Sequence, residues 1–133
     1  MKLPKQPVYK IILVDDEPTV RDAIRMVLAH LGHDVQTADS GLTALVLLET
    51  GRFNLVITDY FMPGMKGDEL AALIKLRQPG LPIIMATAYA SELKADGKLG
   101  GNVDHLLNKP FSVTELRNAI ARVLAQENFS PAP

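Results

Sequence analysis

Continuous apolar runs are the feature that most restricts the fold of this chain. The segments "KIILV", "NLVIT" and "LPIIMATA" carry apolar residues at consecutive positions and not at alternate ones. A strand with one face in water alternates apolar and polar residues, whereas a strand covered on both faces is apolar throughout. These runs therefore indicate strands buried in a parallel sheet. Strand-like segments are predicted at residues 9–14, 34–38, 54–58, 81–86 and 104–107.

The segments between these strands have helical periodicity. In "PTVRDAIRMVLAHLG" apolar residues recur every three or four positions, Pro18 suits the first turn, and Gly32 suits the C-terminal end. Further helices are predicted after Ser40, from about residue 66, and after Ser112, where "SVTE" has the spacing of a capping box. Strands and helices thus alternate along the whole chain.

Alternating strands and helices with right-handed crossovers form an open α/β fold. The predicted architecture is a doubly wound five-stranded parallel sheet, (βα)5. In such folds ligands bind at the carboxyl ends of the strands. The fourth helix is expected to be short or mobile, because "SELKADGKLGGNV" contains Gly97, Gly100 and Gly101, and each glycine costs a helix interior about 1 kcal/mol relative to alanine.

Length and composition exclude several classes of protein. A chain of 133 residues corresponds to one domain, predicted at residues 9–126 between disordered tails at 1–8 and 127–133. The net charge of −1 gives no basic field for direct contact with nucleic acid, and the absence of cysteine excludes disulfides and thiol chemistry. With no signal peptide and no apolar run long enough for a bilayer, we expect a soluble, cytoplasmic protein without membrane contact.

Five polar side chains follow the predicted strands. Asp15 and Asp16 end the first strand, Asp59 the third and Thr87 the fourth, and Lys109 stands just past the fifth. Each alone has an ordinary structural explanation, such as helix capping or a loop position. Because the carboxyl ends of parallel strands meet at one edge of the sheet, all five are expected to lie together. Their common placement predicts a functional site.

The charge of this cluster predicts a bound cation. Three carboxylates against one ammonium leave about two uncompensated negative charges, and two such charges about 4 Å apart repel by roughly 4 kcal/mol at an effective dielectric constant of about 20. Mg²⁺ prefers oxygen ligands from one or two carboxylates, water and a phosphate. Asp15 and Asp16 therefore form a natural metal pair. Carboxylate, Mg²⁺, ammonium and hydroxyl together suit a phosphoryl group, with Asp59 as the nucleophile.

The same residues resemble the receiver domain of two-component response regulators of the chemotaxis-regulator type. The motifs are "VDDEP", "TDYFMPGMKG", "ATAYA" and "NKPF", in the order and at about the spacing of that family, and the resemblance covers residues 9 to about 126. It implies a flavodoxin-like fold and a signalling domain, not an enzyme with a separate substrate. Such a domain assists its own phosphorylation and dephosphorylation and controls a downstream partner.

The resemblance also implies a role for each site residue. Asp59 would accept phosphate from a histidine kinase or phosphotransfer protein. Mg²⁺ would be bound by Asp16, Asp59 and the backbone carbonyl of Phe61, with Asp15 helping directly or through water. The remaining two residues, Thr87 and Lys109, would contact the phosphoryl oxygens, and their movement would carry the signal.

The sequence departs from the family pattern in its signalling elements. Receivers usually carry Tyr or Phe three residues before the lysine, and here that residue is Leu106. We therefore expect phosphorylation to order the glycine-rich fourth helix more than it flips an aromatic ring. The residues two beyond Asp59 and two beyond Thr87 are Phe61 and Tyr89. These aromatics should obstruct water at the acyl phosphate, which predicts slow self-dephosphorylation.

Three other interpretations fit the residues less well. A haloacid dehalogenase-type enzyme would need an Asp two residues after Asp59, where this chain has Phe61. A flavodoxin-like cofactor binder would need a Ser/Thr/Gly-rich loop where "DDEP" would repel the flavin phosphate. A receiver-like interaction module that works without phosphorylation stays open, although the complete set of five polar residues argues against it.

Overall fold

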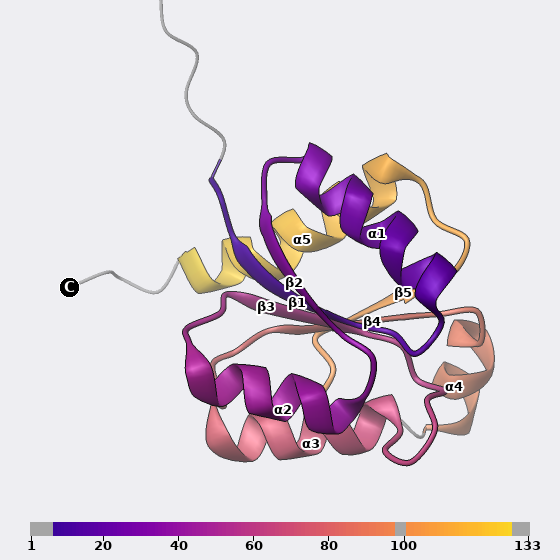
Figure 1. The fold of residues 1–133 in the computed structure, drawn as a ribbon. Helices are drawn as coiled ribbons and strands as arrows, with labels where there is room; N and C mark the ends of the chain where they lie inside the picture. Colours follow the sequence, from indigo (N-terminus) through magenta and orange to yellow (C-terminus); the bar gives the residue numbers. More distant parts are fainter. Residues whose placement is uncertain (1–6, 98–100, 129–133) are drawn as a thin grey trace, which may run out of the picture.

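The computed structural model describes residues 7–97 and 101–128 (Figure 1). Its strands and helices alternate along the chain, as the apolar runs predicted. Most residues of the predicted tails fall outside the described residues, so their disorder and the domain boundaries stay predictions; of the predicted C-terminal tail, residues 127 and 128 belong to α5. The elements are β1 (Lys10–Val14), α1 (Pro18–His30), β2 (Asp34–Ala38), α2 (Gly41–Thr50), β3 (Leu55–Thr58), α3 (Gly67–Arg77), β4 (Ile83–Thr87), α4 (Ala90–Asp96), β5 (His105–Asn108) and α5 (Val113–Asn128).

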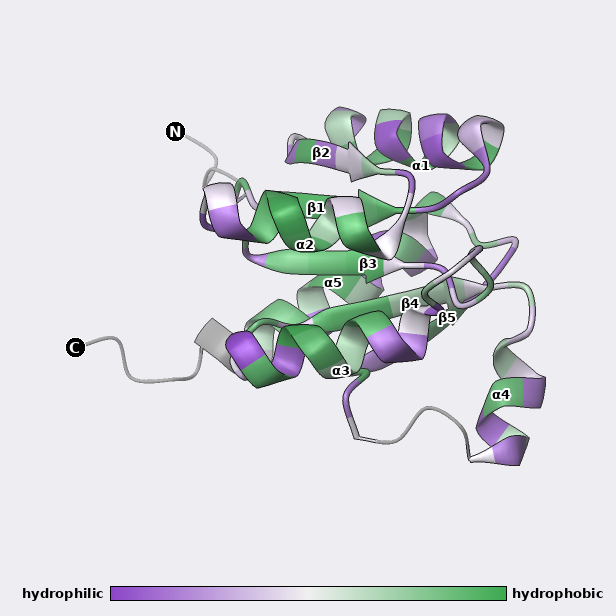
Figure 2. Ribbon diagram, turned by 60° about the horizontal axis from the view of Figure 1, so that its bottom comes forward, coloured by the Kyte–Doolittle hydropathy of each residue, from purple (hydrophilic) through white to green (hydrophobic). Residues whose placement is uncertain are grey.

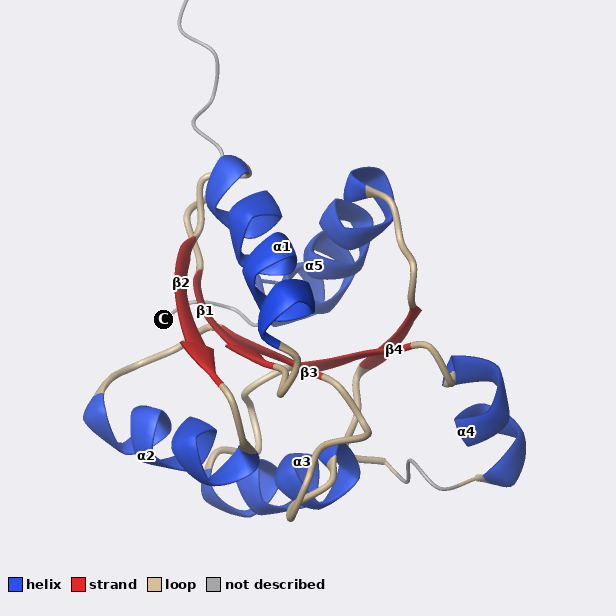
Figure 3. Cartoon of the chain, turned by 45° about the vertical axis from the view of Figure 1, so that its right-hand side comes forward, coloured by secondary structure: helices blue, strands red, loops and turns tan. Residues whose placement is uncertain are grey.

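The sheet is fully parallel and has the strand order β2-β1-β3-β4-β5. Helices α1 and α5 cover one face and α2 and α3 cover the other, while α4 lies to the side, beyond β4 (Figure 3). The predicted doubly wound α/β topology is therefore confirmed. The chain reverses its winding direction between β1 and β3, and it is outside the carboxyl ends of strands at such a point that open α/β sheets bind ligands.

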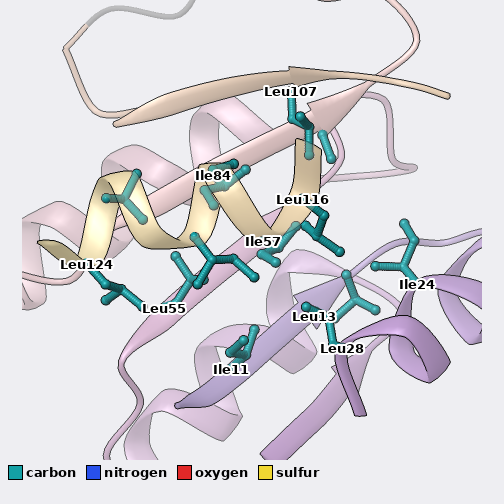
Figure 4. Packing of buried hydrophobic residues seen from close by; sticks show 14 residues of the cluster. Ile11, Leu13, Ile24, Leu28, Leu55, Ile57, Ile84, Leu107, Leu116 and Leu124 are labelled. Carbon is teal, nitrogen blue, oxygen red and sulfur yellow. The ribbon is translucent and has the colours of Figure 1, made fainter. Parts of the chain in front are cut away.

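The central strands send side chains into two separate apolar layers. Along β1, Ile11 and Leu13 pack under α1 and α5, whereas Ile12 and Val14 belong to the cluster beneath α2 and α3. Figure 4 shows the first of these layers, and Figure 2 shows the apolar character of β1, β3 and β4 over most of their length. Burial of each such side chain contributes about 1.5–3 kcal/mol. This two-sided burial is the reason that the strand sequences do not alternate.

The ends of β4 and β5 differ from the prediction by one or two residues. β4 begins at Ile83 and not at Leu81, because Pro82 has no N–H to donate to the ladder. β5 begins at His105, because Asp104 closes the ladder with its side chain. The Ile83 amide donates to Asp104 Oδ2 at 2.8 Å, and the Asp104 amide donates to the Ile83 carbonyl at 2.8 Å.

Most predicted helix boundaries are confirmed. Gly32 follows α1 with a φ of 96°, and the Ser40 side chain caps α2. The capping box before α5 is formed, since the Glu115 amide donates to Ser112 Oγ at 3.0 Å and the Ser112 amide donates to Glu115 Oε1 at 3.1 Å.

Helix α4 is short, as predicted, and ends at Gly97 with a φ of 65°. A second glycine of this stretch, Gly100, lies outside the described residues. A membrane-crossing helix is not found, since none of the helices in the described ranges is both long and apolar enough.

Candidate functional site

Two of the predicted carboxylates meet at one ammonium group. Lys109 Nζ lies 2.7 Å from Asp15 Oδ2 and 3.1 Å from Asp59 Oδ2. Asp15 directly follows β1, Asp59 directly follows β3, and Lys109 directly follows β5. The neighbouring positions of β1 and β3 in the sheet bring the two carboxylates together. Because one positive charge lies between two negative charges, one negative charge of the two carboxylates is not compensated.

Asp15 is a buried acid with both oxygens occupied. Its exposure is 2%, its Oδ2 accepts from Lys109, and its Oδ1 accepts from the Glu17 amide at 3.0 Å. A buried carboxylate without such partners would be strongly destabilising. Within the described residues, no buried side-chain nitrogen or oxygen lacks a partner. Asp15 is therefore a fixed anion that holds the Lys109 ammonium beside Asp59.

Asp59 is held just as firmly but is reachable from solvent. The Tyr60 amide donates to its Oδ1 at 2.6 Å, and its own amide donates to the Val14 carbonyl at 3.1 Å. The side chain is 18% exposed. Asp59 thus combines a fixed orientation with access for an incoming group, which is what a nucleophile needs.

Thr87 is the last residue of β4 and is fully buried. Its hydroxyl accepts from the Tyr89 amide at 3.3 Å. The Lys109 amide donates to the Thr87 carbonyl at 2.9 Å, so the backbones of these two residues are joined directly. The Lys109–Pro110 peptide bond is cis. Three of the predicted residues, Asp59, Thr87 and Lys109, therefore end neighbouring strands at one edge of the sheet.

The predicted metal ligands are only partly assembled. Asp16 is exposed beside Asp15, and Phe61 lies two residues beyond Asp59. Across 7–97 and 101–128, no three acidic, histidine or cysteine side chains are grouped closely enough to form a metal site as they stand. The donor chemistry nevertheless suits Mg²⁺, because carboxylate and backbone oxygens are its preferred ligands. Metal binding by Asp15, Asp16, Asp59 and Phe61 stays a prediction.

Two residues at this edge were missed by the sequence analysis. The Arg21 guanidinium donates from Nη1 to the Asp15 carbonyl at 2.8 Å, which anchors the first turn of α1 to the site. Gly67 packs so closely that a Cβ there would lie 3.0 Å from Tyr60 Cα and would overlap the Asp59 carbonyl oxygen. The only signals in the sequence were a basic residue and a glycine at the starts of helices.

The aromatic residues that flank the site contact one another. The rings of Phe61 and Tyr89 have centroids 4.8 Å apart and an interplanar angle of 80°, and the Tyr60 and Phe61 rings are 4.7 Å apart at 68°. Phe61 and Tyr89 are about half exposed, whereas Tyr60 is buried. The edge-to-face pair thus spans the loops that follow β3 and β4.

Leu106 occupies the position where an aromatic switch was expected by resemblance. It packs with Val103 against a small cluster formed by Tyr60, Met85 and Leu93. Leu93 belongs to α4, and Tyr60 donates its backbone amide to Asp59. Tyr60, the residue beside the candidate nucleophile, therefore belongs to the apolar cluster that also contains Leu93 of α4.

Comparison with known proteins identifies relatives of the same type. The family of response regulator receiver domains matches residues 11–121. The chain is 39% identical to the response regulator protein FleR of Pseudomonas aeruginosa over 85% of its own length, but spans only 24% of FleR. It is 36% identical to the chemotaxis protein CheY-3 of Vibrio cholerae, covering 86% of this chain and 90% of that protein.

A solved structure has the same fold. The response regulator protein TrrA of Thermotoga maritima, in complex with Mg(2+)-BeF, superimposes with a TM-score of 0.81 at 33% identity. The match covers 87% of this chain and 99% of TrrA.

Proposed function

This chain belongs to the response regulator receiver domain family, and from that premise we propose that it is a phospho-accepting signalling domain. Asp59 receives a phosphoryl group from a histidine kinase or phosphotransfer protein in a Mg²⁺-dependent reaction. The phosphorylated form then changes the α4-β5-α5 face and thereby controls a partner.

The observation that carries the proposal is the contact of Lys109 Nζ with both Asp15 and Asp59. A carboxylate that attacks phosphorus must approach a group that is itself negative. The Lys109 ammonium, held in place by the buried Asp15 carboxylate, lies beside Asp59, where the negative charge of the incoming phosphoryl group would accumulate. Lys109 is largely buried, which strengthens the interaction, since the local dielectric is lower than in water.

The reaction forms one bond and breaks one. A carboxylate oxygen of Asp59 attacks the phosphorus of a phosphohistidine, the new O–P bond makes an acyl phosphate, and the P–N bond breaks. The electron pair of that bond stays on the donor imidazole, which takes up a proton from solvent. Lys109 and the Thr87 hydroxyl then bind the phosphoryl oxygens from the ends of β5 and β4.

The carboxylates that support Mg²⁺ binding are Asp15, Asp16 and Asp59, together with the Phe61 carbonyl. When bound, Mg²⁺ supplies positive charge that neutralises the phosphoryl oxygens during transfer. Asp15 already accepts a hydrogen bond from Lys109. It would contribute to metal binding either directly or through a water molecule. The TrrA complex with Mg(2+)-BeF supports this assignment by likeness.

Intact mass spectrometry tests the proposal. The protein is incubated with acetyl phosphate and Mg²⁺, and we expect the mass of one phosphoryl group to be added. Asp59→Asn should abolish the addition. Asp34→Asn, which changes an exposed carboxylate at the start of β2, is the matched control and should leave it unchanged. No addition to the native chain would instead indicate an interaction module that works without phosphorylation.

A further inference from the structure

A surface cavity of about 280 Å³ lies between the start of β1, the end of α1 and the middle of α5. Tyr9 directly precedes β1 and His33 directly precedes β2, so the cavity lies at the amino ends of these strands, at the opposite edge of the sheet from Asp59. Sites for drug-sized ligands occupy about 300–1,000 Å³, so this cavity has room for a small ligand. The apolar part of its lining comes from Pro7, Tyr9, Leu31, Ile120 and Ala121.

His33 contributes a hydrogen-bond donor of defined identity to this cavity. The Tyr9 amide donates to His33 Nδ1 at 3.2 Å, so Nδ1 carries no proton. A neutral imidazole has one protonated nitrogen, which must then be Nε2. Burial lowers the pKa of His33 and thereby favours this neutral form. The polar atom that the ring has left for a ligand is therefore an N–H group.

The wall that holds this donor is fixed by the backbone on both sides. The His33 amide donates to the Leu28 carbonyl at 3.1 Å, and the Asp34 amide donates to the Tyr9 carbonyl at 3.0 Å. The rings of Tyr9 and His33 have centroids 5.5 Å apart and an interplanar angle of 32°. Because these groups are already in place, a ligand would not have to order them, and such preorganisation favours affinity.

Arg117 gives the cavity its positive charge. This residue of α5 is exposed, and it belongs to no ion pair formed between described residues. No acidic side chain from residues 7–97 or 101–128 lines the cavity. A guanidinium group only donates hydrogen bonds, and its planar fork matches the two oxygens of a carboxylate. Arg117 and the His33 N–H group thus favour an anionic acceptor, while the remaining lining favours an apolar body.

We propose that this cavity binds a small aromatic carboxylate, whose oxygens accept from Arg117 and His33 Nε2 and whose ring packs on Tyr9 and Ile120. The site lies away from Asp59 and does not rest on the proposed function. Inorganic phosphate fits less well, because most of the lining is apolar and would be left without a contact.

A chemical-shift titration tests this inference. The isotope-labelled full chain is titrated with benzoate and with phenylacetate, and the backbone amide signals are followed. We expect saturable shifts at Tyr9, His33 and Ala121, with dissociation constants in the millimolar range, as is usual for ligands of so few atoms. Benzyl alcohol and benzylamine keep the ring without the negative charge, and acetate keeps the charge without the ring. Each of these three should bind more weakly than benzoate.

Two variants test the contacts. Arg117→Gln should weaken the binding of benzoate at least about fivefold, since it removes a hydrogen bond to a charged group. Ala121→Leu should block binding, because it fills the cavity from an exposed position of α5. Arg122→Gln is the matched control, since it removes the next cation of α5, which lines a different groove beside β5. It should change the affinity less than about twofold. Thermal unfolding establishes that each variant is folded.

Several results overturn the inference. These are the absence of saturable shifts with both acids, equally tight binding of benzyl alcohol or benzylamine, and native affinity in both Arg117→Gln and Ala121→Leu. Equally tight binding of inorganic phosphate overturns it in favour of a simple oxyanion site. Shifts of the same amides when the ligand-free protein is diluted overturn it in favour of a second copy of this chain.

The Asp59→Asn variant separates this inference from the proposed function. This variant should bind benzoate with native affinity although it should accept no phosphoryl group. A loss of benzoate binding in Asp59→Asn would place the acid at the carboxyl edge of the sheet and would overturn the inference. Failure of acetyl phosphate to modify the native chain would overturn the proposed function and leave the benzoate titration unaffected.

Discussion

Gly67 sets the position of the candidate nucleophile through a close backbone contact. Its amide donates to the Tyr60 carbonyl at 2.8 Å, and a Cβ at this residue would overlap the backbone of Asp59. Gly67→Ala should therefore lower the free energy of unfolding by about 1–3 kcal/mol. It should also slow phosphorylation of Asp59. The better helix propensity of alanine, about 1 kcal/mol, acts in the opposite direction and is smaller than the cost of moving backbone atoms.

Urea unfolding measures the effect of Gly67→Ala, and Gly80→Ala provides the control, because a Cβ at Gly80 has no atom within 4 Å. Equal stability of the two variants would show that the loop after β3 adjusts freely. In that case Gly67 would not position Asp59.

We predict that Phe61 and Tyr89 restrict the access of water to an acyl phosphate on Asp59. Their rings contact each other edge to face at 4.8 Å, and neither side chain offers a carboxylate or amide that could orient water. Replacing both by serine should accelerate the loss of phosphate several-fold, because the site is opened to solvent. The decay of the phosphorylated mass with time gives the rate. Leu76→Ser, an exposed apolar residue on α3, should leave the decay unchanged.

An unchanged decay in the Phe61→Ser/Tyr89→Ser variant would mean that the rings only pack on the surface. The long-lived phosphoryl group predicted from the sequence would then need another cause.

Helix α4 is short and buries few side chains. It has seven residues, of which only Ala90 and Leu93 are buried, and Tyr89 at its N-terminus provides no side-chain cap. A helix held by so few apolar contacts opens at a low free-energy cost. We predict that beryllium fluoride with Mg²⁺ slows amide hydrogen exchange in α4. Mass spectrometry of peptides that cover residues 90–97 measures this, with α1 peptides as the internal control.

The same exchange with and without the phosphoryl mimic would contradict this prediction. Ordering of α4 would then not be the route by which the signal leaves Asp59, and movement of Leu106 would become the simpler explanation.

The apolar runs were sufficient to predict β1, β3 and β4, because two-sided burial keeps these strands almost entirely apolar. Strand ends were less predictable. Asp104 resembles the first residue of a strand, yet it closes the ladder through its carboxylate, a contact with Ile83 across 21 positions. The grouping of Asp15, Asp59 and Lys109 followed from topology alone. Gly67 and Arg21 could not be recognised, since their partners are backbone atoms that leave no pattern in the sequence.

The carboxyl edge of the sheet and its two faces have different roles in the domain. The carboxyl edge carries Asp59 and Lys109, whereas the two apolar layers fix the strands that hold them.

The opposite end of the sheet contains a structural histidine. The Tyr9 amide donates to His33 Nδ1 at 3.2 Å, and the two rings are 5.5 Å apart. This bond requires a neutral ring, because a protonated imidazole cannot accept a hydrogen bond.

The stability of the domain should therefore fall in mildly acidic solution. Burial lowers the pKa of His33, and burial together with Arg122 lowers the pKa of His105. A histidine with a lower pKa in the folded state binds protons more readily when unfolded. Its stabilising contribution is thus present above the unfolded pKa of about 6.5 and is lost as the pH falls through that value. Urea midpoints measured from pH 7.5 to 5.5 should decrease, in a range where ordinary carboxylates stay ionised.

His33→Gln/His105→Gln tests the cause of this dependence. The double variant lacks both titrating rings, so its urea midpoint should change less over the same pH range than that of the native domain. If the variant keeps the full pH dependence, other groups are responsible. Because both histidines lie away from the carboxyl edge, phosphorylation of Asp59 in the double variant should continue at pH 7.5.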